Sequence, residues 1–310
     1  MKDKKSISIF SLIVIGLMLM FTPGCDDDTF KYFLTLEVAP AGTGTVTGAG
    51  EYAEGESVSI SATANQGYEF VNWTDEQDLV IGTTESLNYT MPSADVTLKA
   101  NFTVEIAYGG GVTDIDGNVY QTVIIGNQEW MAENLKTTQL TNGTPIPLVP
   151  DNADWQNLST PGYCWYINDA ATMGNTYGAI YNWYALETGN LCPSGWHEPT
   201  DAEWTTLTDY LGGENIAGGK LKEAGTAHWN TPNTDATNET GFSALPGGWR
   251  SLFGGYNDMG YWGGWWSASE HDASTARYRY IYWNEGAIYS LYDNTNPDKR
   301  NGFSVRCIKD

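Results

Sequence analysis

Aromatic side chains are the most concentrated source of recognition chemistry in this sequence. The stretch GGYNDMGYWGGWWSASE, residues 254–270, carries two tyrosines and three tryptophans among five glycines. The later run RYRYIYWNEGAIYSLYDNTNPDKR, which begins at Arg277, combines Tyr and Trp with Asn, Asp and Arg. Such rings stack on the apolar faces of ligands, while the polar side chains bind hydroxyl groups. The two stretches therefore predict a ligand-binding surface, with candidate residues Tyr256, Tyr261, Trp262, Trp283, Tyr289, Tyr292 and Asn294.

Some of these rings are expected to line a core instead. The second stretch predicts a β-hairpin that turns at residues 284–286. Because side chains alternate between the two faces of a strand, half of its rings must point inward. The inward set is either Tyr278, Tyr280 and Tyr282 or the set that contains Ile281 and Trp283.

Catalytic and metal-binding motifs are sparse. The three histidines, His197, His228 and His271, lack zinc-ligand spacing, and no G-x-S-x-G nucleophile motif occurs. His197, which follows a tryptophan, is expected to be structural. The segment Asp114–Asn118 looks like the front half of a calcium loop, but Ile125 stands where that loop needs glutamate. A plain hairpin turn is therefore preferred, with no cofactor expected and calcium kept as the alternative.

Carboxylates leave one enzymatic alternative open. Glycoside hydrolysis needs a pair of Asp or Glu side chains, and Glu239, Asp258 and Glu270 are candidates whose separation the sequence does not define. The formal net charge of −23 makes nucleic acid a poor partner, since phosphate backbones are repelled. Neutral glycans, cations and basic proteins are compatible with this charge.

The N-terminus predicts export and lipid attachment. A basic start precedes an apolar run from Ile7 to Phe21 that is too short to span a bilayer, and Pro23-Gly24 precedes Cys25. This pattern resembles the lipobox of bacterial lipoproteins, which implies acylation of Cys25. Three aspartates follow and resemble an acidic export tag. We therefore expect an outer-membrane lipoprotein, anchored in outer-membrane lipid through Cys25 and facing the cell exterior.

The three other cysteines allow one disulfide. We favour Cys192 with Cys307, because that bond would fasten the last strand to the start of a helical region. Cys164 with Cys307 is the alternative.

The elements fall into two domains. From residue 33 to 103, short alternating runs separated by glycine turns predict a half-buried antiparallel sheet, and in SVSISATA the Val58 and Ile60 side chains face the core. Three glycines make residues 104–111 a plausible hinge. Residues 112–135 then predict a three-stranded meander. The expected organisation is a signal peptide (1–24), an acidic tether (25–32), a β domain (33–103), a linker (104–111) and a larger domain (112–310).

Two helices are predicted in the larger domain. Residues 177–187 carry apolar side chains at helical spacing. Residues 200–211 begin with Thr200 as N-cap and Glu203 at the third position, which together form a capping box, and Gly212-Gly213 ends the helix.

Longer motifs resemble known families. GYEFVNWT and TLKANF, within residues 33–103, resemble the bacterial repeat related to internalin B-repeats, which implies a small β-grasp-like module. YGAIYNWYA, CPSGWHEPTDAEWTTL, NETGFSALPGGWR, WWSASE and GFSVRC resemble the Fibrobacter succinogenes major paralogous domain. PTDAEW and GFSVRC also resemble the sulfatase-modifying superfamily, whose fold is C-type lectin-like. The resemblance implies an α+β, β-rich chain whose second domain has two helices and a twisted antiparallel sheet.

The resemblance also implies roles for single residues. WWSAS would lie on a central strand, so Trp266 and Trp265 would be core residues, while Tyr256, Tyr261 and Trp262 would lie on an exposed loop. Arg306 would form a buried structural ion pair with Glu203 or Glu198. The clustered cysteine pair of the formylglycine-generating enzymes does not occur in residues 243–270, so we expect no enzyme. We predict a lectin-like surface lipoprotein that adheres to a glycan or surface protein; a structural stalk-and-head protein without a discrete site is the alternative.

Overall fold

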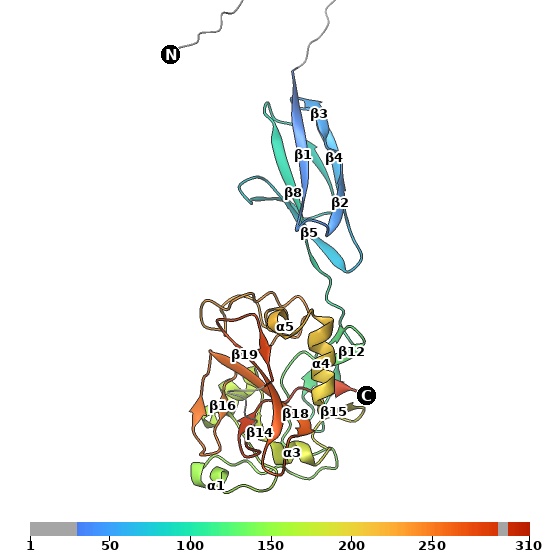
Figure 1. The fold of residues 1–310 in the computed structure, drawn as a ribbon. Helices are drawn as coiled ribbons and strands as arrows, with labels where there is room; N and C mark the ends of the chain where they lie inside the picture. Colours follow the sequence, from blue (N-terminus) through green and yellow to red (C-terminus); the bar gives the residue numbers. More distant parts are fainter. Residues whose placement is uncertain (1–29, 291–296) are drawn as a thin grey trace, which may run out of the picture.

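The computed structural model describes residues 30–290 and 297–310 (Figure 1). Strands predominate over helices and most sheet pairs are antiparallel, which confirms the α+β, β-rich class. The predicted signal peptide, Cys25, Tyr292 and Asn294 lie outside the described residues. Within the described ranges, none of the helices has the length and apolar character needed to cross a bilayer.

The N-terminal β domain contains two sheets. One has the order β3-β1-β8-β5-β6 and the other the order β2-β4-β7 (Figure 1). The strands are β1 (Lys31–Ala39), β2 (Gly44–Thr47), β3 (Gly50–Ala53), β4 (Ser57–Ala64), β5 (Tyr68–Thr74), β6 (Val80–Gly82), β7 (Ser86–Thr90) and β8 (Val96–Val104).

Alternation along β4 works as the sequence predicts. Val58 and Ile60 are buried while Ser57 and Ser59 are exposed, and the inward side chains pack around the fully buried Trp73. The expectation of a wholly antiparallel sheet is wrong, because β1 and β8 pair in parallel. Parallel neighbours need a crossover connection, and here the chain between them passes through the second sheet.

The predicted hinge at residues 104–111 is fastened to the larger domain. Tyr108 forms an antiparallel bridge with Val123, and the Gly109 backbone N–H donates to the Thr122 carbonyl at 2.8 Å. Ile106 packs against the core that contains Val123. Gly109 therefore serves close packing at this point rather than free rotation.

We expect Gly109→Ala to lower the free energy of unfolding by about 1–3 kcal/mol, because its added methyl group overlaps the Thr122 hydroxyl and the Glu129 carboxylate. Movement of the Glu129 side chain away from this methyl group would break its hydrogen bonds from Thr122 and Lys309. Gly110→Ala is the control, because a methyl group there meets open space. Urea denaturation of both variants measures the difference, and equal stabilities would contradict the close-packing explanation.

The larger domain, residues 112–310, is here called the head. Its strands form one four-stranded sheet (β11-β12-β22-β15), one five-stranded sheet (β13-β14-β21-β16-β17), one three-stranded sheet (β18-β19-β20) and the hairpin β9-β10. The strands are β9 (Val112–Thr113), β10 (Val119–Tyr120), β11 (Thr122–Ile125), β12 (Gln128–Met131), β13 (Tyr163–Cys164), β14 (Ile180–Asn182), β15 (Trp196–His197), β16 (Trp249–Arg250), β17 (Tyr256–Asn257), β18 (Trp262–Glu270), β19 (Ala276–Tyr282), β20 (Ile288–Tyr289), β21 (Gly302–Phe303) and β22 (Ile308–Lys309).

The predicted meander is in fact two hairpins in different sheets. β9 pairs with β10, whereas β11 pairs with β12. The chain turns between Tyr120 and Thr122, so that Tyr120 enters one core cluster and Val123 the other. The two hairpins therefore contribute to different cores.

The helices of the head are short. They are α1 (Asn152–Gln156), the 3-10 turn η1 (Tyr166–Asn168), the π-helical turn η2 (Ala170–Gly174), α2 (Asn175–Tyr177), α3 (Trp183–Glu187), α4 (Asp201–Tyr210) and α5 (Glu214–Leu221). Helix α4 has the predicted capping box, in which Thr200 accepts from the Glu203 backbone and the Glu203 carboxylate accepts from the Thr200 backbone.

The predicted helix over residues 177–187 is wrong in its first half. Gly178, with φ 77° and ψ −171°, ends α2, and the next residues form the fully buried strand β14. Asn182 then caps the short helix α3 by accepting from the Ala185 backbone. A segment that is buried on all sides carries no face periodicity, so helix and strand look alike in the sequence.

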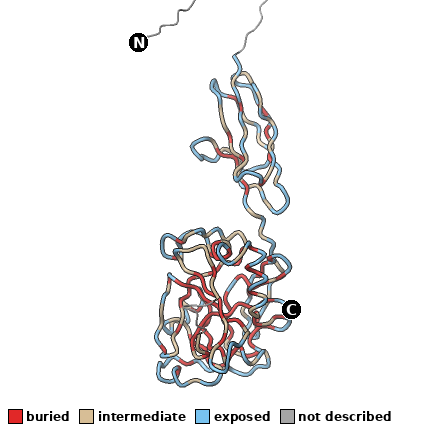
Figure 2. Tube along the Cα trace, viewed as in Figure 1, coloured by how far each residue is buried: buried red, intermediate tan, exposed pale blue. Residues whose placement is uncertain are grey.

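Buried residues gather in the interior of the head (Figure 2), and most of them belong to two core clusters rich in aromatic residues. Trp266 belongs to one and Trp265 to the other, and both are fully buried on β18, as expected. The disulfide joins Cys192 to Cys307, the favoured pairing, and Cys164 is a buried free thiol. The bond fastens the segment before β15 to the chain just before β22.

Candidate ligand-binding pocket

The structure divides the sequence-predicted aromatic residues among separate places. Tyr261, which is 46% exposed, packs edge-to-face against the half-buried Trp283 with ring centroids 5.1 Å apart. Tyr256 packs against the guanidinium of Arg250, and its hydroxyl donates to Asn168 Oδ1 at 2.8 Å. Tyr289 stacks on Tyr280. Tyr256 therefore has different neighbours from Tyr261 and Trp283, whereas Trp283 and Tyr289 both contact Tyr282.

The expectation that Trp262 is exposed is wrong, since its side chain is 5% exposed. Its ring folds back over Gly264, where no larger residue would fit, and stacks on Tyr280 at a centroid distance of 5.8 Å. β18 begins at this residue, so the glycines that suggested an irregular loop instead make room for the indole ring.

Trp262 nevertheless reaches a pocket of about 250 Å³. Five of the eight lining residues are aromatic. Phe303 lies at the centre of the rings, with its centroid 5.3 Å from that of Trp262 and 5.2 Å from that of Tyr278. The lining residues are Trp249, Asp258, Trp262, Tyr278, Tyr282, Pro297, Asn301 and Phe303.

Two polar side chains join the rings in the pocket, and both are held in place. The Trp249 indole N–H donates to Asp258 Oδ2 at 2.8 Å. Asn301 is 9% exposed and its Oδ1 accepts from the Leu252 backbone N–H at 2.7 Å. Among the described residues, no protein atom accepts a hydrogen bond from Asn301 Nδ2. The pocket therefore offers a fixed carboxylate and an amide donor that has no partner in the part of the chain that the structure describes.

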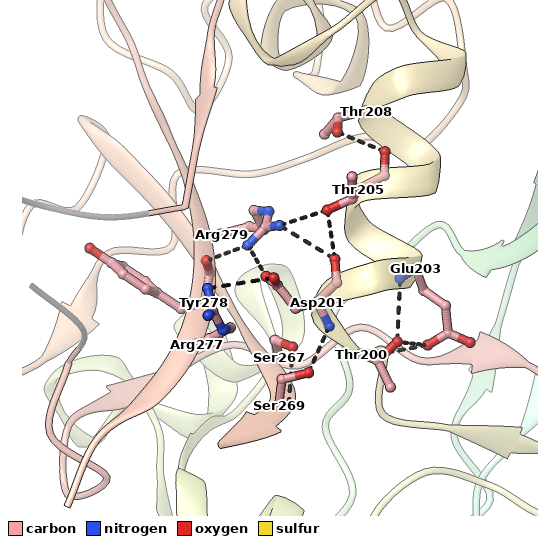
Figure 3. A network of polar contacts seen from close by, with 10 residues as sticks. All are labelled: Thr200, Asp201, Glu203, Thr205, Thr208, Ser267, Ser269, Arg277, Tyr278 and Arg279. Carbon is pink, nitrogen blue, oxygen red and sulfur yellow. Dashed lines mark hydrogen bonds and ion pairs between the residues drawn. The ribbon is translucent and has the colours of Figure 1, made fainter. Parts of the chain in front are cut away.

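Buried polar contacts position the strands that carry these residues. Arg250, next to Trp249 on β16, is fully buried and donates to the carbonyls of Val149 and Gly254 at 2.5 and 2.9 Å. On β19, Tyr278 faces the pocket while Arg279 points to the start of α4, where it pairs with Asp201 at 2.5 Å (Figure 3). Side-chain alternation thus sends neighbouring residues to the pocket and to the helix.

The buried residues of β19 come from both of the alternative sets that the sequence predicted to face inward. Tyr278, Tyr280 and Ile281 are all buried, because both faces of the strand are covered. Tyr278 and Tyr280 belong to the core that contains Trp266, and Ile281 belongs to the core that contains Trp265. Tyr282 and Trp283 are half-buried.

The predicted ion pair of Arg306 with Glu203 or Glu198 is wrong. Arg306 is 1% exposed and donates to the Phe242 and Ser243 carbonyls and to Asn134 Oδ1. The predicted carboxylate partners have other donors: Glu203 accepts from Thr200 and contacts His197, and Glu198 accepts from the Leu191 and Cys192 backbones. The Phe242 ring lies 4.0 Å from the guanidinium and takes the place expected of a carboxylate.

The segment that looked like a calcium loop is a hairpin turn. Asp114 Oδ1 accepts from the backbones of Asp116 and Asn118, and Asp114 Oδ2 accepts from the Tyr120 hydroxyl at 2.6 Å. Within the described residues, there is no group of three or more His, Cys, Asp or Glu side chains arranged to hold a metal ion.

His197 links the start of α4 to the C-terminal residue. Its ring nitrogens lie 2.8 Å from Glu203 Oε1 and 2.8 Å from Asp310 Oδ1. Burial alone would lower the pKa of His197, but the hydrogen bonds to Asp310 and Glu203 outweigh it, so this pKa is raised. A histidine whose pKa is higher in the folded than in the unfolded protein stabilises the fold. This contribution is fully present at pH values below the unfolded-state pKa, and it is lost as pH rises through the folded-state pKa.

We therefore expect His197→Ala to lower the melting temperature more at pH 5.5 than at pH 8. His271→Ala is the control, because that residue lies on an exposed turn. Thermal unfolding of each variant at both pH values measures the contrast. A His197→Ala effect that does not change with pH would show that the charged pairs do not contribute.

Sequence reasoning missed five pocket residues: Trp249, Asp258, Pro297, Asn301 and Phe303. Asp258 was considered only as a hydrolase carboxylate, and the other four were not singled out. They come from separate segments that the sheets bring together. Trp249 lies in the motif NETGFSALPGGWR, which carries part of the family resemblance. That motif is the signal in the sequence that could have drawn attention to Trp249.

The fold is that of a two-domain, β-rich protein, and the two domain types matched below are of a surface-associated kind. The chain belongs to the Fibrobacter succinogenes major domain family, whose pattern matches residues 123–309. Residues 34–106 match the divergent InlB B-repeat domain. Both matches agree with the resemblances seen in the sequence. Comparisons with curated proteins and with solved structures found no match.

Proposed function

We propose that the head is a lectin-like domain that binds a glycan in the pocket between β16, β18, β19 and β21. The observation that carries the proposal is the combination of five aromatic side chains with Asp258 and the buried amide of Asn301. Sugar rings offer apolar C–H faces to aromatic rings and hydroxyl groups to carboxylates and amides. The volume of about 250 Å³ lies below the roughly 300–1,000 Å³ of drug-sized sites and suits one sugar unit.

A glycan array followed by calorimetric titration of the best ligand tests this proposal. Trp249→Leu should abolish binding, because Trp249 is a half-buried wall of the pocket that also holds Asp258. Tyr261→Leu is the matched control, since Tyr261 is exposed and does not line the pocket. Loss of binding in Tyr261→Leu and not in Trp249→Leu would move the site to the Tyr261–Trp283 pair. No binding to any glycan would refute the proposal.

A protein ligand is the second candidate. It is supported by two exposed aromatic side chains outside the pocket, Phe253 at 66% and Tyr261 at 46% exposure. Pull-down from surface extracts that fails with Phe253→Ser and Tyr261→Ser, while Trp249→Leu still binds, would favour this candidate over the glycan.

We propose that the chain is displayed on the outer membrane through acylated Cys25, on the basis of the N-terminal sequence pattern. Protease treatment of intact and permeabilised cells tests the orientation. Cleavage only after permeabilisation would refute display on the exterior.

We infer that the head binds without catalysis. Two of the candidate carboxylates are paired with lysines, Glu270 with Lys299 and Glu239 with Lys220, and Asp258 is held by Trp249. A screen against a broad panel of polysaccharides should show no cleavage. Release of sugar that is lost in Asp258→Asn would overturn this inference.

A further inference from the structure

The rings that line the pocket pack closely against one another. The Phe303 centroid lies 6.1 Å from that of Trp249 and 5.3 Å from that of Trp262, and Trp249 and Trp262 are 6.3 Å apart. A cation is attracted to an aromatic ring within about 6 Å of its centroid. A positive group inside the pocket would therefore be within reach of several rings at once.

The charges of the lining residues favour the same kind of group. Asp258 is the one charged side chain among the eight described residues that line the pocket, and none of the eight is Lys, Arg or His. The hydrogen bond from Trp249 holds Asp258 Oδ2 beside the rings. The backbone carbonyl of Asp258 also accepts from the Tyr261 and Trp262 N–H groups at 3.0 Å, which fixes the loop that carries the carboxylate.

The whole chain adds a field of the same sign. Its formal charge of −23 raises the local concentration of cations and lowers that of anions. An anionic sugar such as a uronic acid would meet Asp258 without a compensating basic side chain. An ammonium group would meet both the carboxylate and the ring faces.

We propose that the pocket recognises its ligand through an ammonium group, carried either by a quaternary ammonium headgroup of the choline type or by an amino sugar. The proposal rests on the proposed function, since it names the ligand chemistry of the same site. The neutral amide donor of Asn301 then serves an oxygen of the same ligand, because Asn301 Nδ2 has no acceptor among the described residues of the protein.

Calorimetric titration of the full chain with choline and with 3,3-dimethylbutan-1-ol separates charge from shape, because the second compound replaces the ammonium nitrogen with carbon. We expect choline to bind at least about tenfold more tightly. Asp258→Asn should remove most of this difference and leave the binding of the neutral compound unchanged. Asp209→Asn, an exposed carboxylate on α4, is the matched control and should behave as the wild type.

Glucosamine and glucose form the second pair of ligands and identify the source of the ammonium group. Tighter binding of glucosamine than of choline assigns the site to amino sugars, and the reverse assigns it to choline-type headgroups. In both cases the indole N–H signal of Trp249 in a nitrogen–proton correlation spectrum should shift on binding. Trp249→Leu, checked for folding by circular dichroism, removes both the signal and the binding.

The ammonium proposal is overturned if choline binds no better than its neutral analogue and glucosamine no better than glucose, and equally if neither cation binds. Glycan binding that depends on Trp249 would still support the proposed function in that case. Conversely, the absence of any glycan ligand would refute the glycan proposal even if choline binds and Asp258→Asn weakens it. The two failures are therefore distinguishable.

Discussion

Replacing Cys192 and Cys307 together by alanine should lower the free energy of unfolding of the head by about 3–5 kcal/mol. The bond closes a loop with a sequence separation of 115 residues, and long closed loops lose much chain entropy in the unfolded state. Both cysteines are also buried, so alanine additionally removes packed sulfur atoms. Urea denaturation followed by tryptophan fluorescence measures the effect. The fluorescence reports mainly on the head, because all tryptophans of the sequence except Trp73 lie after residue 112.

Cys164→Ala is the control for this experiment. Its thiol is buried and forms no disulfide, so the variant tests the loss of one sulfur atom without the loss of a cross-link. We expect a change of about 1 kcal/mol. Reduction of the wild type should reproduce the instability of the double variant. If the double variant were as stable as Cys164→Ala, the bond would contribute little to the folded state.

Arg306→Met should be the most destabilising single substitution of a charged residue that we propose, at about 3 kcal/mol. Methionine keeps much of the apolar stem but leaves the Phe242 and Ser243 carbonyls without a donor in a buried place. Each buried unpaired carbonyl costs about 1–3 kcal/mol, which is partly offset because a desolvated guanidinium is removed. Burial also lowers the pKa of Arg306, because the charged guanidinium is removed from water.

Arg277→Met is the matched control. Arg277 is half-buried, and its guanidinium lies 3.6 Å from Asp201, a pair that is partly open to solvent. Such pairs contribute between 0 and about 1 kcal/mol. Chemical denaturation of the two methionine variants should therefore separate them by at least about 2 kcal/mol. Equal losses would mean that the Arg306 donors are replaced by water and that its contacts are not structural.

Strands that have one solvent-facing side could be predicted from the sequence. β4 and β5 in the β domain and the capping box of α4 follow from alternation and from cap residues. Helix and strand could not be told apart at β14, which is covered on every side, because burial on both faces removes the polar positions that reveal the period. At β19 the predicted hairpin is confirmed, since β19 pairs with β20 in antiparallel fashion, but the inward face could not be predicted because both faces are buried. Trp262 was expected on the surface because the glycines around it suggested an irregular loop, whereas Gly264 makes room for its ring.

The candidate pocket could be predicted only in part. The aromatic stretches indicated where recognition chemistry is concentrated, and Trp262 does line the pocket. Asn301 and Phe303 reach it because β21 lies between β14 and β16, a long-range pairing that local patterns do not contain. Arg306 was correctly expected to be buried, but its partners are neutral oxygens and a ring, which leave no charge signal in the sequence.

The parallel pairing of the first and last strands of the β domain has a mechanical consequence. β1 begins at Lys31 and β8 ends at Val104, and six residue pairs, Leu34 with Val96 through Ala39 with Asn101, lie between these ends. A pull on the two ends in opposite directions loads all of these hydrogen bonds in shear, so they must break together rather than one after another. We expect single-molecule pulling through the termini to require more force than pulling across the β5–β6 hairpin. A β domain built this way should resist unfolding when its two ends are pulled apart.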